Sequence, residues 1–330
     1  MRTLRNTTAM VAILAVTGIL AGCTTGSAGG AEESAAPTVD KVTIDTTSMS
    51  GANEIAKVGG FFDDELAELG IAVEYTLLGT STQMLEGLAS RALDFTDIGY
   101  VAVATGAAAN VPFDIIGAAS SGGGDAILVP TGGATSIEDL AGATVATSKG
   151  SSAWALLVRA LEDAGMSTDD IELIDLAPDE AQNAFLTGQV DAWALWVGTK
   201  SDAVNDTNSE ELITGEELGL VPGAIVTRTA LAESDPVVID AFLRARQSAV
   251  GWLAEDPEAV AEAIAADRNV EVAVATRFLE LSAPMNEAVD EELAETYQSI
   301  ADLFADLGEI SSSPDIAARV NNTFIESIAD

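Results

Sequence analysis

The segment ATVATSKGSSAWALLVRALEDAGMSTDDIELIDLAPDEAQNAFLTGQVDAWALW, residues 143–196, alternates between two hydrophobic patterns. Short apolar runs predict strands, and longer stretches with apolar residues three or four apart predict helices: strands at 143–147, 171–175 and 192–197, helices at 152–164 and 179–187. The run 192–197 is apolar on both faces, which is typical of a central strand of a parallel sheet. The segment therefore predicts an α/β unit in which helices flank a mostly parallel sheet.

The sequence on either side continues this alternation. Further strands are predicted at 41–45, 71–78, 94–98, 126–130 and 223–227. A helix is predicted at 53–70, and from Asp235 onward the pattern is that of a helical tail. This order predicts two α/β lobes, the second inserted into the first: lobe 1 is residues 40–123 plus 226–330, and lobe 2 is residues 124–225.

The amino terminus has the pattern of an export signal. Arg2 and Arg5 precede a short apolar stretch, which ends in Leu20-Ala21-Gly22-Cys23 and is too short to span a membrane. This ending resembles the lipobox of bacterial lipoproteins, in which the cysteine carries the lipid. Residues 1–22 are thus predicted to be a signal peptide, Cys23 a lipid anchor in the cell membrane, and residues 23–39 a flexible tether. The remaining chain is expected to be extracytoplasmic.

Composition excludes several classes of function. The formal charge of −39 disfavours nucleic acid and anionic lipid as partners, and fits a soluble surface that suits a salty habitat. The chain has no histidine and one cysteine, so it has no Ser-His-Asp triad, no disulfide as a monomer and none of the usual zinc sites. No spacing singles out a pair of acids for catalysis. We expect a monomeric protein that is not an enzyme and needs no cofactor or metal.

Ligands of open α/β sheets lie at the carboxyl ends of the strands, beside helix amino termini. Polar or aromatic residues that follow the predicted strands are Ser48, Ser50 and Asn53; Thr80, Ser81 and Thr82; Gly99 and Tyr100; Ser148 to Ser152; and Trp196. Hydroxyls at a helix start bind anions, although each of them alone is equally suited to N-capping. Lys149 precedes Gly150 rather than following it, so the segment does not match a P-loop and suits a small anion instead.

Two tryptophans lie on the predicted strand 192–197. Side chains alternate between the two faces of a strand, so Trp193 and Trp196, three positions apart, point to opposite faces. At most one of the two rings can line a pocket on a given face. Trp196 lies nearer the carboxyl end and is the candidate for contact with an aliphatic ligand. Trp193 is expected in the core, and Asp191, at the other end of the strand, is expected to pair locally.

Residues 40–250, and most specifically residues 126–196, resemble the nitrate/sulfonate/taurine-type substrate-binding proteins of bacterial ABC importers, most of all the aliphatic sulfonate-binding lipoproteins. The similar features are the Lys-Gly-Ser-Ser helix start and the strand Val190-Asp191-Ala192-Trp193-Ala194. The resemblance implies a two-lobed periplasmic-binding-protein fold of type II, a small anionic ligand in the cleft, and a permease with its ATPase as partners. It places Ser50, Thr80, Ser81, Gly99, Tyr100, Ser151, Ser152 and Trp196 at the cleft; Asn53 joins them from the strand-end rule.

The chain also departs from that family. An acid usually follows the second tryptophan, where this chain has Val197-Gly198, and Tyr100 stands where many members have Asp or Ser. The missing acid favours a ligand without an amine, such as an alkanesulfonate. Nitrate, a carboxylate, a thiamine-precursor pyrimidine and a structural or adhesive role that involves no ligand remain alternatives.

Overall fold

A computed structural model describes residues 37–78, 80–120, 125–196, 209–220, 223–281 and 284–328. The chain divides into two units, residues 1–35 and 36–330, and the described residues all belong to the second. The signal peptide, Cys23 and most of the tether lie outside this part of the chain. Within the described residues, no helix is both long and apolar enough to cross a bilayer.

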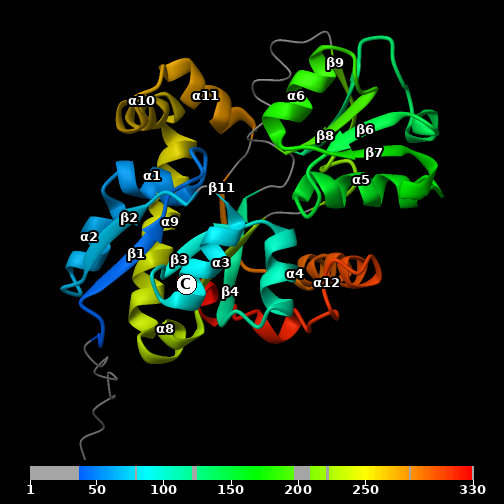
Figure 1. Ribbon diagram of the computed structural model, residues 1–330. Helices are drawn as coiled ribbons and strands as arrows, with labels where there is room; N and C mark the ends of the chain where they lie inside the picture. Colours follow the sequence, from blue (N-terminus) through cyan, green and yellow to red (C-terminus); the bar gives the residue numbers. More distant parts are fainter. Residues whose placement is uncertain are drawn as a thin grey trace, which may run out of the picture. The chain divides into compact units, whose positions relative to one another are not determined.

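The described residues form two β-sheets (Figure 1). The six-stranded sheet has the order β11 (Pro284–Glu287), β4 (Phe113–Ser120), β10 (Ala224–Arg228), β3 (Phe95–Ile98), β1 (Lys41–Asp45) and β2 (Ala72–Thr76). The five-stranded sheet has the order β7 (Glu172–Asp175), β6 (Thr144–Thr147), β8 (Ala192–Leu195), β5 (Ala126–Pro130) and β9 (Ser209–Thr214). The strands of the second sheet come from one continuous part of the chain, and those of the first come from both sides of it.

In each sheet most strands run in one direction, as the sequence predicted, and antiparallel strands are inserted among them. In the first sheet β1 pairs parallel with β2 and β3, but β10 is antiparallel to β3 and β4. In the second, β6 pairs parallel with β7 and β8, but β5 is antiparallel to β8 and β9. The reason is that β10 and β5 are the strands that begin after the chain changes sheet, and each inserts next to a strand that runs the other way. The two-sheet α/β architecture itself is as expected.

Helices flank both sheets. Their bounds are α1 Ala52–Val58, α2 Phe61–Ala67, α3 Ser81–Ser90, α4 Tyr100–Ala108, α5 Ser152–Asp163, α6 Pro178–Leu186, α8 Thr229–Ser234, α9 Pro236–Glu255, α10 Pro257–Arg268, α11 Val272–Leu281, α12 Glu291–Asp306 and α13 Thr323–Ser327, with short 3-10 helices at Ile137–Leu140, Thr168–Asp170 and Ala317–Arg319. The sequence predicted one helix over 53–70. It divides into α1 and α2 because Gly60 adopts φ +75°, a conformation that interrupts a right-handed helix.

Strand β8 shows how the second sheet is packed. Ala192 and Ala194 join the hydrophobic cluster that contains α5, whereas Trp193 joins the cluster of α6, where its ring lies 6.1 Å from that of Phe185. Helices α5 and α6 therefore cover opposite faces of the sheet (Figure 1). Trp193 is a core residue, as the sequence predicted. Trp196 directly follows β8, at the carboxyl end of this strand.

Candidate functional site

A cavity of about 400 Å³ lies where several strands end. Its lining comes from the segments that follow β2, β3, β6 and β8, and therefore from both sheets. The lining residues are Thr80, Ser81, Thr82, Leu85, Gly99, Val101, Ala102, Thr105, Ser148, Lys149, Gly150, Ser151, Ser152 and Trp196. We call it the hydroxyl pocket. It brings together six of the residues selected from the sequence as a binding site: Thr80, Ser81, Gly99, Ser151, Ser152 and Trp196.

Two of its hydroxyls are helix caps. Thr80 Oγ1 accepts a hydrogen bond from Gln83 N at 3.3 Å at the start of α3. Ser151 Oγ accepts one from Trp154 N at 3.2 Å at the start of α5 and donates to Ser148 O at 2.6 Å. Because Ser151 has already committed its only proton, its side chain has no donor left for a ligand. The capping interpretation thus applies to these two residues.

Further hydroxyls at the pocket are those of Ser81, Thr82 and Ser152. They occupy the first turns of α3 and α5, where the first backbone N–H groups have no partner within the helix. Such helix ends carry a partial positive charge and bind oxyanions. The apolar part of the lining consists of Leu85, Val101 and Ala102, together with the half-buried Trp196.

Lys149 is the single charged residue in the described lining of the hydroxyl pocket. Its ammonium lies 5.7 Å from the centre of the Trp154 ring, and its backbone N–H donates to Asp175 Oδ1 at 3.1 Å. The next residue, Gly150, adopts φ +76°, which turns the chain into α5. The sequence analysis included Lys149 in the stretch Ser148 to Ser152 but gave it no role in binding. Its position directly before a hydroxyl-rich helix start was the signal that could have identified it.

Tyr100 begins α4 and does not line the hydroxyl pocket. Its hydroxyl lies 3.2 Å from Asp125 Oδ2 and 3.0 Å from Ser152 O, and its side chain is buried. Burial and the neighbouring Asp125 carboxylate raise the pKa of Tyr100 well above its usual value of 10. The family resemblance placed Tyr100 at the cleft, whereas here its hydroxyl connects the segment after β3 to the start of α5.

Ser50 and Asn53 also lie outside the hydroxyl pocket. Ser50 is buried in the turn before α1. Asn53 is buried as well, and its Nδ2 donates to Asp45 O at 3.0 Å. Asn53 lines a separate cavity of about 120 Å³, which we call the Asp45 cavity and which is lined by Asp45, Thr46, Thr47, Ser48, Gly51, Asn53, Met84 and Asp97.

A buried arginine that the sequence analysis missed organises this edge of the first sheet. Arg246, on α9, is fully buried. Its Nη1 donates to both carboxylate oxygens of Asp97, at 2.9 and 3.1 Å, and to Asn53 Oδ1. Its Nε donates to Asn286 Oδ1 at 3.3 Å and its Nη2 to Met285 O at 3.1 Å. A charged residue within the apolar face of a long predicted helix was the signal available in the sequence.

Opposing effects act on the pKa of the Asp97 carboxyl group. Burial raises the pKa of its carboxyl above the usual value, Arg246 lowers it, and the nearby Asp45 raises it again. The ion pair with Arg246 is what makes a charged Asp97 tolerable at this depth, since a buried carboxylate without a cationic partner is costly.

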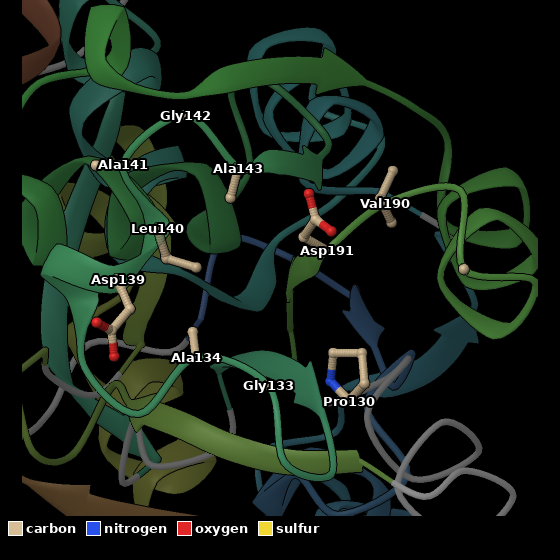
Figure 2. Close-up of a pocket in the computed structure, with 11 residues that line it drawn as sticks. Pro130, Gly133, Ala134, Asp139, Leu140, Ala141, Gly142, Ala143, Val190 and Asp191 are labelled. Carbon is tan, nitrogen blue, oxygen red and sulfur yellow. The ribbon is translucent and has the colours of Figure 1, made fainter.

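A further cavity of about 430 Å³ lies at the amino-terminal ends of β6 and β8 in the second sheet (Figure 2). Its two acids, Asp139 and Asp191, come from separate segments of the lining and are both engaged locally. Asp191 Oδ2 accepts from Thr144 N at 2.8 Å, as the sequence suggested, and Asp139 accepts from Thr135 and Ser136, which lowers its pKa. The rest of the lining is glycine, alanine, proline, leucine and valine. Despite its size, this cavity offers less to an anion than the hydroxyl pocket does.

Prediction for the buried arginine: Arg246→Met should lower the free energy of unfolding by about 3–5 kcal/mol, because it leaves the partly buried Asp97, 19% exposed, without its counterion. Arg244→Met is the matched control on the same helix. Arg244 is 47% exposed and pairs with Glu65, so its loss should cost less than about 1 kcal/mol. Urea unfolding monitored by tryptophan fluorescence measures both, and equal losses would show that the Arg246 network contributes little.

Several known proteins are similar to this chain over most of its length. A Bacillus subtilis (strain 168) protein named an aliphatic sulfonates-binding protein is 31% identical over 320 residues, 96% of this chain and 95% of that protein. The periplasmic aliphatic sulphonate binding protein SsuA from Escherichia coli superposes with a TM-score of 0.80 at 25% identity, covering 86% of this chain and 92% of the other. The alkanesulfonate-binding protein SsuA from Xanthomonas axonopodis pv. citri, bound to MOPS, gives 0.73 at 25% identity, covering 87% and 99%.

The family model described as NMT1/THI5 like matches residues 54–260. This range contains the whole of the second sheet and every residue of the hydroxyl pocket. The match extends over more than half of the chain, and the Bacillus subtilis relative aligns with nearly all of it. The chain belongs to the NMT1/THI5-like family.

Proposed function

We propose that this protein is the extracytoplasmic solute-binding receptor of an ABC importer and that it captures a small organic sulfonate in the hydroxyl pocket. The observation that carries the proposal is the composition of that pocket: the amino termini of α3, α4 and α5, hydroxyl groups, one lysine and several apolar residues line it together. The relatives support it, because they are named for binding aliphatic sulfonates and are binding proteins. The permease and ATPase are the partners that such a receptor requires.

A sulfonate matches the chemistry of this lining. It carries one negative charge on three oxygens, which can accept hydrogen bonds from the hydroxyls of Ser81, Thr82 and Ser152 and from the free N–H groups of the first helical turns. The Lys149 ammonium supplies the counter-charge. Hydrogen bonds to a charged group are the stronger ones, so several fixed donors compensate the anion for its lost water.

The carbon chain of the ligand is assigned to the apolar part of the lining. Leu85, Val101 and Ala102 offer aliphatic surface, and Trp196 offers a large ring at the end of β8. Each buried methylene contributes about 0.8 kcal/mol, so an alkanesulfonate should bind more tightly than sulfate or nitrate. The same donors could also bind the oxygens of nitrate or of a carboxylate, whereas a neutral pyrimidine would leave Lys149 without a counterion.

The placement of the receptor follows the same proposal. An export signal at residues 1–22 and a lipid on Cys23 would hold the protein at the outer side of the cell membrane as a monomer. Both segments lie outside the described residues, and this arrangement stays a prediction.

The test of the proposed ligand is thermal unfolding of the full-length protein against a panel of ligands: alkanesulfonates, sulfate, nitrate, carboxylates and pyrimidines. A ligand present at about a hundred times its dissociation constant stabilises the folded state by roughly 2.7 kcal/mol, which raises Tm by several degrees. We expect a shift with alkanesulfonates that grows with chain length. A shift confined to a pyrimidine would replace the sulfonate, and no shift with any compound would support a structural lipoprotein.

Substitution of two adjacent serines should distinguish a residue that caps α5 from a residue that binds the ligand. Ser151→Ala removes the N-cap of α5 and should cost about 0.5–2 kcal/mol of stability. Ser152→Ala removes a donor at the pocket and should weaken sulfonate affinity about tenfold with little change in stability, since a hydrogen bond to a charged group contributes about 1.5–3 kcal/mol. Urea unfolding and calorimetric titration measure the two effects. Unchanged affinity in Ser152→Ala would exclude this hydroxyl from the ligand.

Lys149→Met should weaken sulfonate binding at least tenfold and make the remaining affinity less sensitive to salt. The reason is that it removes the charged group that faces the ligand from the described lining. Lys41→Met is the control, because Lys41 is an exposed lysine paired with Glu74 on the first two strands. Calorimetric titration at two salt concentrations measures the difference. Equal affinities in the two variants would remove Lys149 from the site.

A further inference from the structure

The ammonium of Lys149 lies over an aromatic ring rather than beside an acid. Its Nζ is 5.7 Å from the centre of the Trp154 ring, which is within the range of a cation–π contact. Lys149 forms no ion pair with any residue that the structure describes, whereas Lys41 and Lys57 are each paired with an acid. Acids are abundant in this chain, 53 against 14 basic residues, so the missing ion pair sets Lys149 apart from these two lysines.

An acidic partner and an aromatic partner have different effects on a lysine. A carboxylate beside the ammonium would neutralise its charge, and an anionic ligand would then have to displace that partner or share the lysine with it. The face of an aromatic ring attracts a cation through its quadrupole, but the ring carries no net charge. The Trp154 ring therefore holds the Lys149 ammonium and leaves its positive charge available to a ligand.

Asp175 contacts Lys149 through the lysine backbone. Its Oδ1 accepts a hydrogen bond from Lys149 N at 3.1 Å, and its carboxylate forms no ion pair with the ammonium. Asp175 is exposed, and a lysine carries its charge on a flexible four-carbon stem. Without the ring, the ammonium would be free to leave the pocket or to pair with this neighbouring acid. The contact with Trp154 is the restraint on its position that the structure shows.

The indole N–H of Trp154 is not what fixes this residue in place. The side chain is 4% exposed, and its Nε1 has no hydrogen-bond partner among the described residues. A buried N–H without a partner costs free energy, and phenylalanine or leucine would avoid that cost. Among aromatic side chains, tryptophan binds cations most strongly. The contact with Lys149 is thus the interaction for which tryptophan is better suited than either of these replacements.

Trp154 is placed by the start of α5 and lies outside the hydroxyl pocket. Its backbone N–H donates to Ser151 Oγ at 3.2 Å, and its side chain packs in the hydrophobic cluster that contains the other buried residues of α5. Gly150, with φ +76°, turns the chain between Lys149 and this helix. The described lining of the pocket includes Lys149 but not Trp154. An effect of the Trp154 ring on a ligand must therefore pass through a neighbouring residue, and Lys149 is the charged one.

We propose that Trp154 is a positioning residue of the binding site: its ring holds the Lys149 ammonium at the hydroxyl pocket, not neutralised by an acid, where it pairs with the anionic group of the ligand. This inference rests on the proposed function and adds to it a residue that acts without touching the ligand. A ring that binds cations less strongly should hold Lys149 less well, so the affinity for a sulfonate should fall when Trp154 is replaced by phenylalanine.

The experiment is a double-mutant cycle with pentane-1-sulfonate, measured by calorimetric titration of the full-length protein. Trp154→Phe, which keeps the backbone N–H that Ser151 caps, should weaken the affinity about two- to fivefold. In the Lys149→Met background the same substitution should change the affinity no further, because the group through which Trp154 acts is gone. Unchanged affinity in Trp154→Phe, or the same loss in both backgrounds, would overturn the inference and leave the proposed function standing. If the wild-type protein does not bind the sulfonate, the proposed function fails and the inference fails with it.

Trp193→Phe is the matched control, because it makes the same change at another buried tryptophan. Trp193 is 2% exposed, and its ring lies 6.1 Å from that of Phe185 in the cluster on the other face of the second sheet. The control should lower Tm and leave the affinity for pentane-1-sulfonate unchanged. A loss of affinity in Trp193→Phe equal to that in Trp154→Phe would assign both losses to damage of the core and overturn the inference.

A measurement without ligand tests the contact itself and does not depend on the folding of Trp154→Phe. In wild-type protein labelled with ¹³C-lysine, the ε-methylene protons of Lys149 should resonate upfield of those of Lys41, because an aromatic ring shields protons that lie over its face. Lys41 is the reference because it is paired with Glu74. The spectrum of Lys149→Met assigns the Lys149 signal. Equal chemical shifts for the two lysines would show that the ring does not hold Lys149 in solution and would overturn the inference.

Discussion

The buried guanidinium of Arg246 is the interaction on which the edge of the first sheet depends. It joins α9 to β3 through Asp97, to α1 through Asn53 and to β11 through Asn286 and the Met285 carbonyl. These elements come from distant parts of the chain, and no apolar contact alone would fix the directions of their polar side chains. Because burying the Arg246 charge without its partners costs free energy, the arrangement is stable only when every partner is present. The polar partners of Arg246 therefore hold the residues around the Asp45 cavity in one geometry.

The electrostatics of the chain impose a second constraint. With a formal charge of −39, the protein as a whole repels an anion, and its field is screened beyond about 8 Å at physiological ionic strength. An anion site must consequently be assembled from contacts at hydrogen-bond distance. Lys149 over the Trp154 ring, together with the starts of α3 and α5, provides such contacts within a small volume.

The sequence predicted what depends on local pattern. The apolar run that became β8, the core position of Trp193 and the helix start after Gly150 all follow from side-chain period and capping chemistry. The antiparallel insertion of β10 and β5 was missed because strand direction is decided by partners far away in the chain. For the same reason Arg246 went unnoticed: its importance lies in which distant groups it meets. Ser151 lines the hydroxyl pocket, and its hydroxyl caps α5, a role that the sequence pattern alone could not distinguish from ligand binding.

Tyr100 does not line the hydroxyl pocket, but its hydroxyl connects two of the segments that form the pocket. It directly follows Gly99, which lines the pocket, and its hydroxyl reaches the carbonyl of Ser152, which lines the pocket from α5. The same hydroxyl lies at hydrogen-bond distance from Asp125, the first described residue of the segment that enters the second sheet. A ligand that draws Ser152 toward its oxygens must act on the residue that Tyr100 holds. Under the proposed function, the ligand and Tyr100 both contact the first turn of α5, at Ser152.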